Sequence, residues 1–266
     1  MIPVALTVAG SDSGGGAGIQ ADLKTFADHG VFGTSAIAAI TAQNSRGVTR
    51  VDPVPVEGLV AQLEAVFDDF EVRAVKIGML GSMGHVRATA TFLAALDPRP
   101  PVVLDPVMVA STGHRLLQSD AEAALRDELL PLATVATPNL EEASVLAGTD
   151  ERDAILAWAR ARPTALLITG GDVVGDTITD VLFTGGVGRE WTHRRRGDRA
   201  FHGTGCTTSS AIAARLAKGD ELGAAIDGAI AYVQERIADA DDHGSVGRGN
   251  PSLIHGRGRH PAWSGD

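Results

Sequence analysis

The chain has 266 residues, is 44% hydrophobic and carries a formal net charge of -10. This length and apolar content allow one substantial core, so we expect a single domain over residues 1–250. An acidic chain lacks the basic face that nucleic-acid binding requires, which argues against a nucleic-acid partner. No apolar run reaches the length of a membrane span, and Cys206 is the only cysteine. Both features favour a soluble, cytoplasmic protein without disulfides.

Six short apolar runs, rich in Val and Ile, recur between longer amphipathic stretches. Because these runs do not alternate polar and apolar residues, both of their faces should be buried, as in a parallel sheet covered by helices. The predicted strands are Pro3–Ala9, Ser35–Thr41, Ala74–Ile77, Val102–Leu104, Thr134–Thr137 and Ala165–Thr169. This pattern predicts a doubly wound α/β fold with a mostly parallel sheet and flanking helices.

The stretches between the predicted strands carry the apolar spacing of crossover helices. The clearest examples are Leu59, Leu63, Val66 and Phe67, and then Leu125, Leu129 and Leu130. Around Gly185-Gly186 the pattern changes to two short strand-like pieces between residues 180 and 193, which predicts an antiparallel hairpin at the sheet edge. Two further helices are expected over residues 207–218 and 222–240. Residues 251–266, with little periodicity, are expected to form a loose C-terminal tail.

A glycine-rich turn opens the predicted helix near residue 207, with the sequence Gly203-Thr204-Gly205-Cys206. Small residues let backbone N–H groups converge, and the helix adds the positive end of its dipole, so this turn can hold transferring phosphate oxygens. At a helix N-terminus the pKa of the Cys206 thiol should fall, which would make the residue a general base for a substrate hydroxyl. Spacing alone leaves a second possibility open, a buried cysteine that serves as a small apolar residue.

A second glycine-rich loop, residues 10–18, follows the first predicted strand. Its glycines permit close backbone approach to a ligand, so we interpret it as a binding loop rather than a connector. Gly16, Gly18 and Ala21 fit the loose dinucleotide pattern of a dehydrogenase. The next strand, however, ends in residues 41–44 without the acidic residue that would bind the ribose, and the chain contains no Gly-Lys-Ser/Thr of a P-loop.

Polar side chains also follow two later strands, where open α/β sheets bind ligands. Asp105 comes directly after one strand, and Asn139 with Glu141-Glu142 follows the next. Mg²⁺ needs only one or two such oxygens beside nucleotide phosphates, which makes Asp105 and Glu142 candidate metal ligands. The alternatives are a turn residue for Asp105 and a helix N-terminal charge for the glutamate pair.

Six motifs together closely resemble the hydroxymethylpyrimidine/phosphomethylpyrimidine kinases of thiamine biosynthesis, in order from residue 3 to residue 250. They lie at residues 9–25, 41–44, 76–80, 104–108, 137–139 and 202–206. The resemblance implies a ribokinase-like fold, MgATP as phosphate donor and a homodimer. It also implies phosphorylation of 4-amino-5-hydroxymethyl-2-methylpyrimidine and then of its monophosphate, which yields the pyrophosphate.

The resemblance also implies roles for most of the site residues. Substrate contacts fall on Asp22, Gln43, Met79 and Val107, catalysis on Cys206, Gly203 and Gly205, a phosphate contact on Asn139, and Mg²⁺ binding on Asp105 and Glu142. Thr169 and Thr204 are further candidate phosphate contacts, outside the roles that the resemblance assigns. The residue types fit these roles, because the Gln43 amide offers a donor and an acceptor to an aminopyrimidine edge, and Met79 with Val107 can contact the ring. For Asp22, an exposed helix charge is the alternative.

One departure from the family concerns Thr169, which stands where similar kinases often carry a phosphate-contacting lysine. It resembles a threonine of the sugar kinases, whose hydroxyl contacts nucleotide phosphate, and leaves the efficiency of the second phosphorylation open. Arg194-Arg195-Arg196 and Arg199 offer either replacement charge or a solvated strand edge. The alternative functions are a pyridoxal or pyridoxine kinase, a pyrimidine-binding module without catalysis, and a dehydrogenase.

Overall fold

An eight-stranded sheet forms the centre of the protein, which a computed structural model describes over residues 1–110, 113–170, 175–195, 201–243 and 246–256. The strands are β1 Val4–Ala9, β2 Phe32–Ile37, β5 Val72–Ile77, β6 Val102–Leu104, β7 Val135–Ala136, β8 Ala165–Ile168, β9 Thr177–Thr184 and β10 Val187–Arg194. They lie in the order β10-β9-β8-β7-β6-β5-β1-β2, and every pair from β8 to β2 is parallel.

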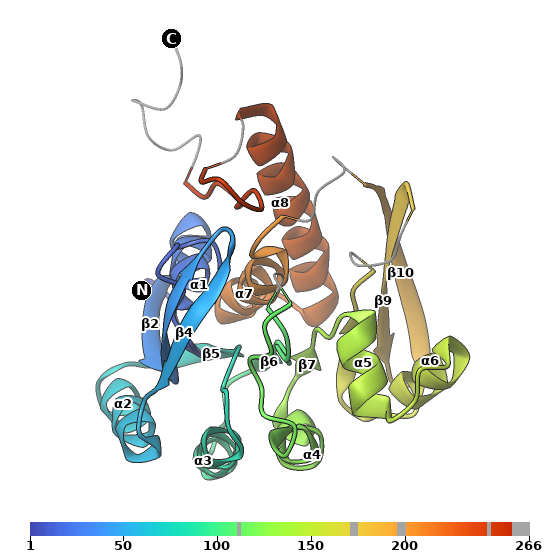
Figure 1. The fold of residues 1–266 in the computed structure, drawn as a ribbon. Helices are drawn as coiled ribbons and strands as arrows, with labels where there is room; N and C mark the ends of the chain where they lie inside the picture. Colours follow the sequence, from blue (N-terminus) through green and yellow to red (C-terminus); the bar gives the residue numbers. More distant parts are fainter. Residues whose placement is uncertain (111–112, 171–174, 196–200, 244–245, 257–266) are drawn as a thin grey trace.

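The edge of the sheet formed by β9 and β10 is antiparallel, as the sequence predicts. The two strands are joined by Gly185 and Gly186, whose φ angles of 56° and 81° lie in the left-handed region that glycine reaches without a steric penalty. The ribbon in Figure 1 shows this hairpin standing at one side of the molecule, beyond α5 and α6. The prediction of an edge hairpin is therefore confirmed.

The prediction of one strand over Ser35–Thr41 is wrong. The chain leaves the sheet at Ala38, and β3 (Ala39–Asn44) pairs instead with β4 (Gly47–Pro53) in a separate antiparallel hairpin. Ala38 donates its N–H to the end of β1 and accepts from the residue that follows β4, so its two backbone bonds lead to different partners. A continuous apolar run gives no signal of such a change, because both strands remain partly buried.

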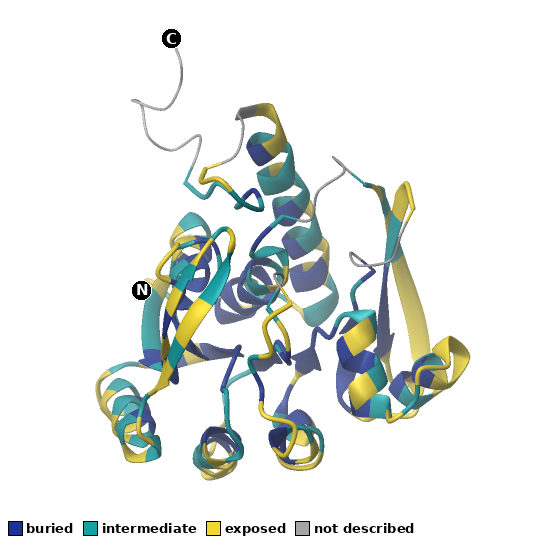
Figure 2. Ribbon diagram, viewed as in Figure 1, coloured by how far each residue is buried: buried dark blue, intermediate teal, exposed yellow. Residues whose placement is uncertain are grey.

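Helices cover both faces of the sheet (Figure 1). On one face lie α1 Gly18–Asp28, α7 Thr204–Ala217 and α8 Leu222–His243, and on the other lie α2 Val56–Asp69, α3 Met83–Ala94, α4 Ala121–Ala124, α5 Leu140–Ala147 and α6 Arg152–Arg160. Neighbouring strand residues such as Leu166 and Leu167 belong to opposite cores, and neither is exposed. The inner strands of the sheet are dark in Figure 2 because both of their faces are buried, which explains the absence of polar alternation in them. The predicted doubly wound α/β class is confirmed.

The winding of the sheet reverses beside β1, which has β2 on one side and β5 on the other. Ligands of open α/β sheets bind at such a reversal, outside the carboxyl ends of the strands. The glycine loop leaves β1 at Gly10, whose N–H donates to the carbonyl oxygen of Met79 in the loop after β5, at 3.0 Å. The fold therefore joins the first and third of the sequence motifs at one point.

The first part of the predicted C-terminal tail is packed. Residues 246–256, which we call the C-terminal strap, cross the glycine loop, and Leu253 is only 5% exposed. Backbone hydrogen bonds join Asn250 to Ser45 and Pro251 to His202, and the N–H of Gly256 donates to the Asp28 carboxylate. The packed chain thus continues past the predicted boundary at residue 250, because the strap that follows α8 binds His202, directly before the glycine-rich turn at residues 203–206. Residues 257–266, the rest of that prediction, lie outside the described residues.

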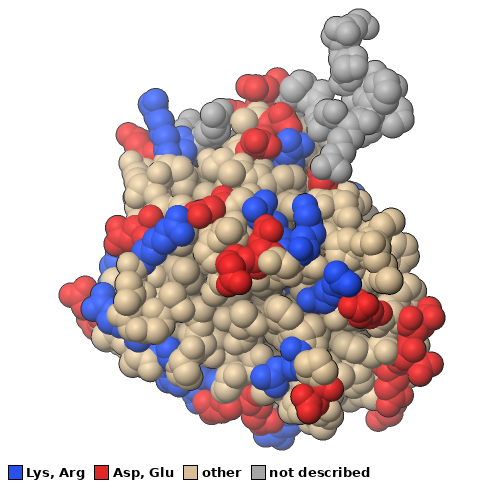
Figure 3. All heavy atoms as spheres, turned by 180° about the vertical axis from the view of Figure 1, so that it is seen from behind, with Lys and Arg blue, Asp and Glu red and all other residues tan. Residues whose placement is uncertain are grey.

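The described helices include none that is long and apolar enough to cross a membrane. Seen from behind, the surface carries basic and acidic side chains intermixed among other residues (Figure 3). This distribution agrees with the acidic net charge of -10 and adds no support for a nucleic-acid partner.

Candidate active site

A cavity of about 300 Å³ lies at the carboxyl ends of the parallel strands. The glycine loop and β3 form one end of it, the N-terminus of α7 forms the middle, and β9, β10 and α8 form the other end. Its volume is in the range of small-molecule sites. The predicted site residues that line it are Gln43, Met79, Asp105, Val107, Asn139, Glu142, Thr169, Gly203, Thr204, Gly205 and Cys206. The structure therefore brings together every predicted site residue except Asp22.

Two glycine-rich segments cross at the middle of the cavity. Gly203 has a φ of 88°, and a Cβ atom there would collide with the backbone oxygen of Gly16. This close approach needs glycine at position 203, and it starts α7 at Thr204, three residues earlier than the sequence predicts. The first N–H groups of a helix have no partner within the helix, so those of residues 204–206 are available at the cavity.

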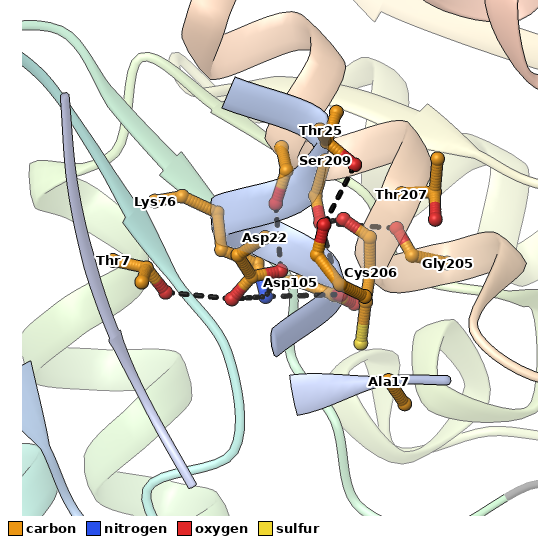
Figure 4. A network of polar contacts seen from close by, with 12 residues as sticks. Thr7, Ala17, Asp22, Thr25, Lys76, Asp105, Gly205, Cys206, Thr207 and Ser209 are labelled. Carbon is orange, nitrogen blue, oxygen red and sulfur yellow. Dashed lines mark hydrogen bonds and ion pairs between the residues drawn. The ribbon is translucent and has the colours of Figure 1, made fainter. Parts of the chain in front are cut away.

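Below the cavity, Lys76 lies between two carboxylates, those of Asp22 and Asp105; we call these three residues the buried ionic cluster (Figure 4). The Lys76 Nζ atom is 3.0 Å from the carboxylate of Asp22 and 3.9 Å from Oδ2 of Asp105. Thr7 and Ser210 donate hydrogen bonds to Asp22 at 2.6 and 2.7 Å. Every lone pair of Asp22 thus faces the protein interior.

This geometry corrects both interpretations of Asp22. The side chain is fully buried and does not line the cavity, so it is neither a pyrimidine contact nor an exposed helix charge. Its place is fixed by a lysine 54 residues away, and such a long-range partner leaves no trace in local spacing. Asp22 stabilises the charge of Lys76, which no sequence pattern assigned to the site.

The charges of the buried ionic cluster depend on one another. Burial disfavours the ammonium group of Lys76, but the nearby Asp22 carboxylate and the Cys206 and Asp105 groups outweigh this effect and raise the pKa of Lys76. Burial raises the pKa of Asp105, against the opposing pull of Lys76 and a hydrogen bond from Ser209. One ammonium therefore lies beside two carboxyl groups, and it is nearer to Asp22 than to Asp105.

The Cys206 thiol faces the cavity beside Ala17, at the first turn of α7 (Figure 4). Burial raises its pKa to about 12, although Lys76 and a hydrogen bond from the Gly18 backbone act in the opposite direction. The expected fall in pKa is therefore wrong for this site. Desolvation beside two carboxylates exceeds the effect of the helix N-terminus, so the thiol is protonated at neutral pH.

The two predicted metal ligands already have partners within the protein. Glu142 and Asn139 form a reciprocal capping box at the start of α5, with bonds of 2.8 and 3.0 Å, so Glu142 serves the helix N-terminus as well as lining the cavity. Asp105 accepts a hydrogen bond from Ser209 at 3.0 Å. In the described part of the chain no three His, Cys, Asp or Glu side chains cluster as metal ligands. Two carboxylates at a cavity suit Mg²⁺, which keeps most of its ligands as water and phosphate oxygens.

Sequence reasoning missed an arrangement that we call the Asp12–His202–Gln43 relay. The Asp12 carboxylate accepts from the backbone N–H groups of residues 14, 16 and 17, and its Oδ2 is 2.9 Å from Nε2 of His202. The same His202 atom is 3.3 Å from Nε2 of Gln43. The available signal was an acidic residue at the start of a glycine loop, which is typical of a side chain that organises the following turn.

Further polar groups reach the cavity from strands at its middle and far end. Thr137 is 5% exposed, and its hydroxyl has no hydrogen-bond partner among the described residues, which makes it a candidate ligand contact. Arg194 and Arg195 also line the cavity. This position favours the interpretation that they supply the positive charge missing at Thr169 over that of a purely solvated strand edge. Arg196 and Arg199 lie outside the described residues.

Known proteins are similar to this chain in sequence and in fold. Residues 12–252 match the phosphomethylpyrimidine kinase family. A hydroxymethylpyrimidine/phosphomethylpyrimidine kinase of Rhizobium meliloti is 48% identical over 262 residues, which cover 96% of this chain and 97% of the relative. The enzyme of the same name from Streptomyces coelicolor is 49% identical over 242 residues, or 88% of each chain.

Two solved structures support the same relationship. Pyridoxal kinase from Bacillus subtilis, in an ADP complex, superposes with a TM-score of 0.84 at 36% identity and covers 96% of this chain and 98% of its own. Phosphomethylpyrimidine kinase from Clostridium difficile gives 0.77 at 38% identity, over 89% of this chain and 100% of its own. The fold is thus ribokinase-like, and the chain belongs to the family of hydroxymethylpyrimidine/phosphomethylpyrimidine kinases.

Proposed function

We propose that this chain transfers phosphoryl groups from ATP to 4-amino-5-hydroxymethyl-2-methylpyrimidine and then to its monophosphate. The observation that carries the proposal is the position of the α7 N-terminus in the middle of the cavity. On one side lie Gln43, Met79 and Val107, which suit a small aminopyrimidine. On the other side the cavity continues to Thr169 and α8, which leaves room for a nucleotide.

In the first reaction the Cys206 sulfur accepts the proton of the substrate hydroxyl while that oxygen attacks the γ-phosphorus and ADP leaves. The backbone N–H groups at the start of α7 donate to the transferring phosphoryl oxygens. Asp105 and Glu142 are the residues that would hold Mg²⁺, which neutralises phosphate charge when it is bound. Because the pKa of Cys206 is raised to about 12, only a small fraction of the thiol is ready to accept a proton at neutral pH.

The second reaction makes a smaller demand on Cys206. Its acceptor is a phosphate oxygen, which is already ionised above a pKa of about 6 and has no proton to lose. Positioning and charge compensation then carry the step. The buried ionic cluster and the arginines at the cavity should serve both reactions, whereas the thiol should serve mainly the first.

The proposal is tested with purified protein, MgATP and each acceptor in turn. ADP formation should depend on the pyrimidine alcohol and, separately, on its monophosphate, and phosphorus NMR should show the mono- and diphosphorylated products. An absence of ADP formation with both acceptors would contradict the proposal. Tight pyrimidine binding without ATP turnover would instead support a binding module.

A second candidate function is phosphorylation of vitamin B6 alcohols. The favouring observation is the superposition on the Bacillus subtilis pyridoxal kinase over nearly the full length of both chains. Turnover of pyridoxal, pyridoxine and the aminopyrimidine alcohol in the same assay separates the two candidates, and we expect the highest kcat/KM for the aminopyrimidine. A cytoplasmic homodimer is part of the proposal, and light scattering of the purified protein tests the dimer.

A further inference from the structure

The Gln43 side-chain amide lies between two polar neighbours, Thr41 and His202. Its Oε1 is placed 3.4 Å from Oγ1 of Thr41, and its Nε2 is placed 3.3 Å from Nε2 of His202. The Gln43 backbone is held by Ser13, which accepts from its N–H at 2.9 Å and donates to its carbonyl at 2.7 Å. The oxygen and nitrogen of an amide have nearly the same shape, so the hydrogen-bonding roles of the neighbours decide which way it faces.

Thr41 can only accept a hydrogen bond from Gln43. A hydroxyl has one proton, and the Thr41 hydroxyl lies 2.8 Å from the carbonyl oxygen of Ser11, much closer than the 3.4 Å to Gln43. The Ser11 carbonyl cannot donate, so the Thr41 proton is committed to it. The lone pairs of Thr41 remain for Gln43, and they require the amide nitrogen on that side.

His202 Nε2 cannot accept a hydrogen bond from Gln43. Its Nε2 faces Oδ2 of Asp12 at 2.9 Å. Burial opposes the charge of that carboxylate, but the hydrogen bond from His202 and the backbone N–H groups of the glycine loop together lower the pKa of Asp12. An ionised carboxylate only accepts, so His202 Nε2 carries a proton. A Gln43 nitrogen beside this N–H would place two donors together. The amide oxygen can instead share the proton that His202 directs mainly at Asp12, which favours the oxygen on that side.

We infer that Asp12 and His202 on one side and Thr41 on the other hold the Gln43 amide with Oε1 toward His202 and Nε2 toward Thr41, and that this orientation selects the hydrogen-bonding pattern of the substrate ring. The inference rests on the proposed function for the kind of ring. His202 and Thr41 act as positioning residues, because they work through Gln43.

The fixed amide distinguishes two pyrimidines of the same shape. After its contacts within the protein, the amide keeps one lone pair on Oε1 and one N–H on Nε2 for a ligand. The aminopyrimidine edge presents an N–H donor beside a ring-nitrogen acceptor. The 4-oxo analogue presents the reverse, a carbonyl acceptor beside a ring N–H. Only one of these two compounds can pair with both Oε1 and the free N–H of a Gln43 amide held in one orientation. The other compound leaves polar groups unpaired in a buried site.

The test compares kcat/KM for the 4-amino alcohol and its 4-oxo analogue in wild type, His202→Leu and His202→Gln. We expect wild type to prefer the amino compound by about 100-fold or more. His202→Leu removes the N–H donor and should lower this preference about tenfold, whereas His202→Gln retains a donor and should stay within about threefold of wild type. Thr41→Val and Thr41→Ser form a second matched pair. The valine variant should lose part of the preference for the amino compound, and the serine variant, which keeps the hydroxyl, should retain it. Melting temperatures report whether each variant folds.

A merely structural role would reduce turnover of both compounds alike. An unchanged amino/oxo ratio in His202→Leu, or equal ratios in the leucine and glutamine variants, would overturn the inference. If His202→Leu does not fold, the Thr41 pair decides by the same criterion. If wild type phosphorylates neither compound, the proposed function fails, and the ratio of dissociation constants measured by calorimetry in the same variants decides the orientation of Gln43.

Discussion

The floor and the wall of the cavity use polar residues in different ways. The buried ionic cluster at the bottom of the cavity is almost fully buried, and its charges depend on one another across α1, β5 and the end of β6. The Asp12–His202–Gln43 relay forms part of the wall, where Gln43 is half-buried and Asp12 binds mainly backbone N–H groups. The first arrangement is a set of charges and the second a set of oriented hydrogen bonds.

We therefore expect the floor to support stability and catalysis and the wall to set the choice of substrate ring. Loss of one charge from a buried set leaves the others uncompensated, so the floor should tolerate little change in either stability or catalysis. Loss of one oriented bond in the wall leaves the fold in place and changes which ring is accepted. Substitutions in the floor and in the wall should therefore differ in whether they change stability or the choice of ring.

The removal of Lys76 should have the largest effect. Lys76→Met leaves Asp22 and Asp105 as two buried carboxylates without a cation, so unfolding free energy should fall by about 3–5 kcal/mol and turnover should be undetectable. Urea denaturation and the ADP assay measure both. Lys218→Met, at an exposed lysine beyond the end of α7, is the matched control and should behave like wild type. A stable, active Lys76→Met enzyme would contradict the account of the floor.

The second-largest effect is expected from the loss of the Cys206 thiol, and it should fall mainly on the first phosphorylation. Cys206→Ala should lower the first phosphorylation by about 100- to 10,000-fold, because a base is lost, and should change the second by only a few-fold. With a pKa of about 12, the thiolate fraction rises about tenfold per pH unit, so wild-type kcat/KM for the alcohol should increase from pH 7 to 9.5. The alanine variant should lack this increase. Equal losses in both reactions would rule out Cys206 as the base.

A smaller effect is expected where the C-terminal strap meets α7. Burial lowers the pKa of His255 from 6.5 to about 4, and its Nε2 lies 3.3 Å from the Thr207 hydroxyl. Because the folded-state pKa is depressed, the stability that neutral His255 supports is present above pH 6.5 and is lost as the pH falls toward 4. Wild type should therefore lose on the order of 1–3 kcal/mol more over this range than His255→Gln. Parallel curves of unfolding free energy against pH for wild type and His255→Gln would contradict this role of His255.

The smallest effect is expected at Thr169. A lysine there would face the nucleotide end of the cavity in a partly exposed position, where such a charge contributes about 0–1 kcal/mol. Thr169→Lys should therefore leave kcat unchanged and lower KM for ATP by no more than about fivefold. Thr169→Val keeps the shape without the hydroxyl and serves as the control. A large loss in both variants would show that the threonine hydroxyl has its own role.

Much of the architecture could be predicted from the sequence because its causes are local. Apolar runs indicate the buried strands, Gly185-Gly186 indicates the hairpin, and small residues before a helix indicate the turn at residues 203–206. The order of the motifs also indicates the family. Helix α7 nevertheless begins three residues earlier than predicted, and one apolar run is divided between two sheets. These differences arise because long-range backbone partners, rather than residue types, end and begin those elements.

The charges of the site were decided by tertiary structure alone. Asp22 meets Lys76 across 54 residues and Ser210 across 188, and no local pattern predicts such partners. The pKa of Cys206 rises because packing removes water from a thiol beside two carboxylates, whereas the sequence shows only the helix N-terminus that would lower it. Sequence alone therefore indicated most of the residues that gather at the site, but not Lys76, Asp12 or His202. Desolvation and distance, which exist only once the chain is packed, decided what those residues can do there.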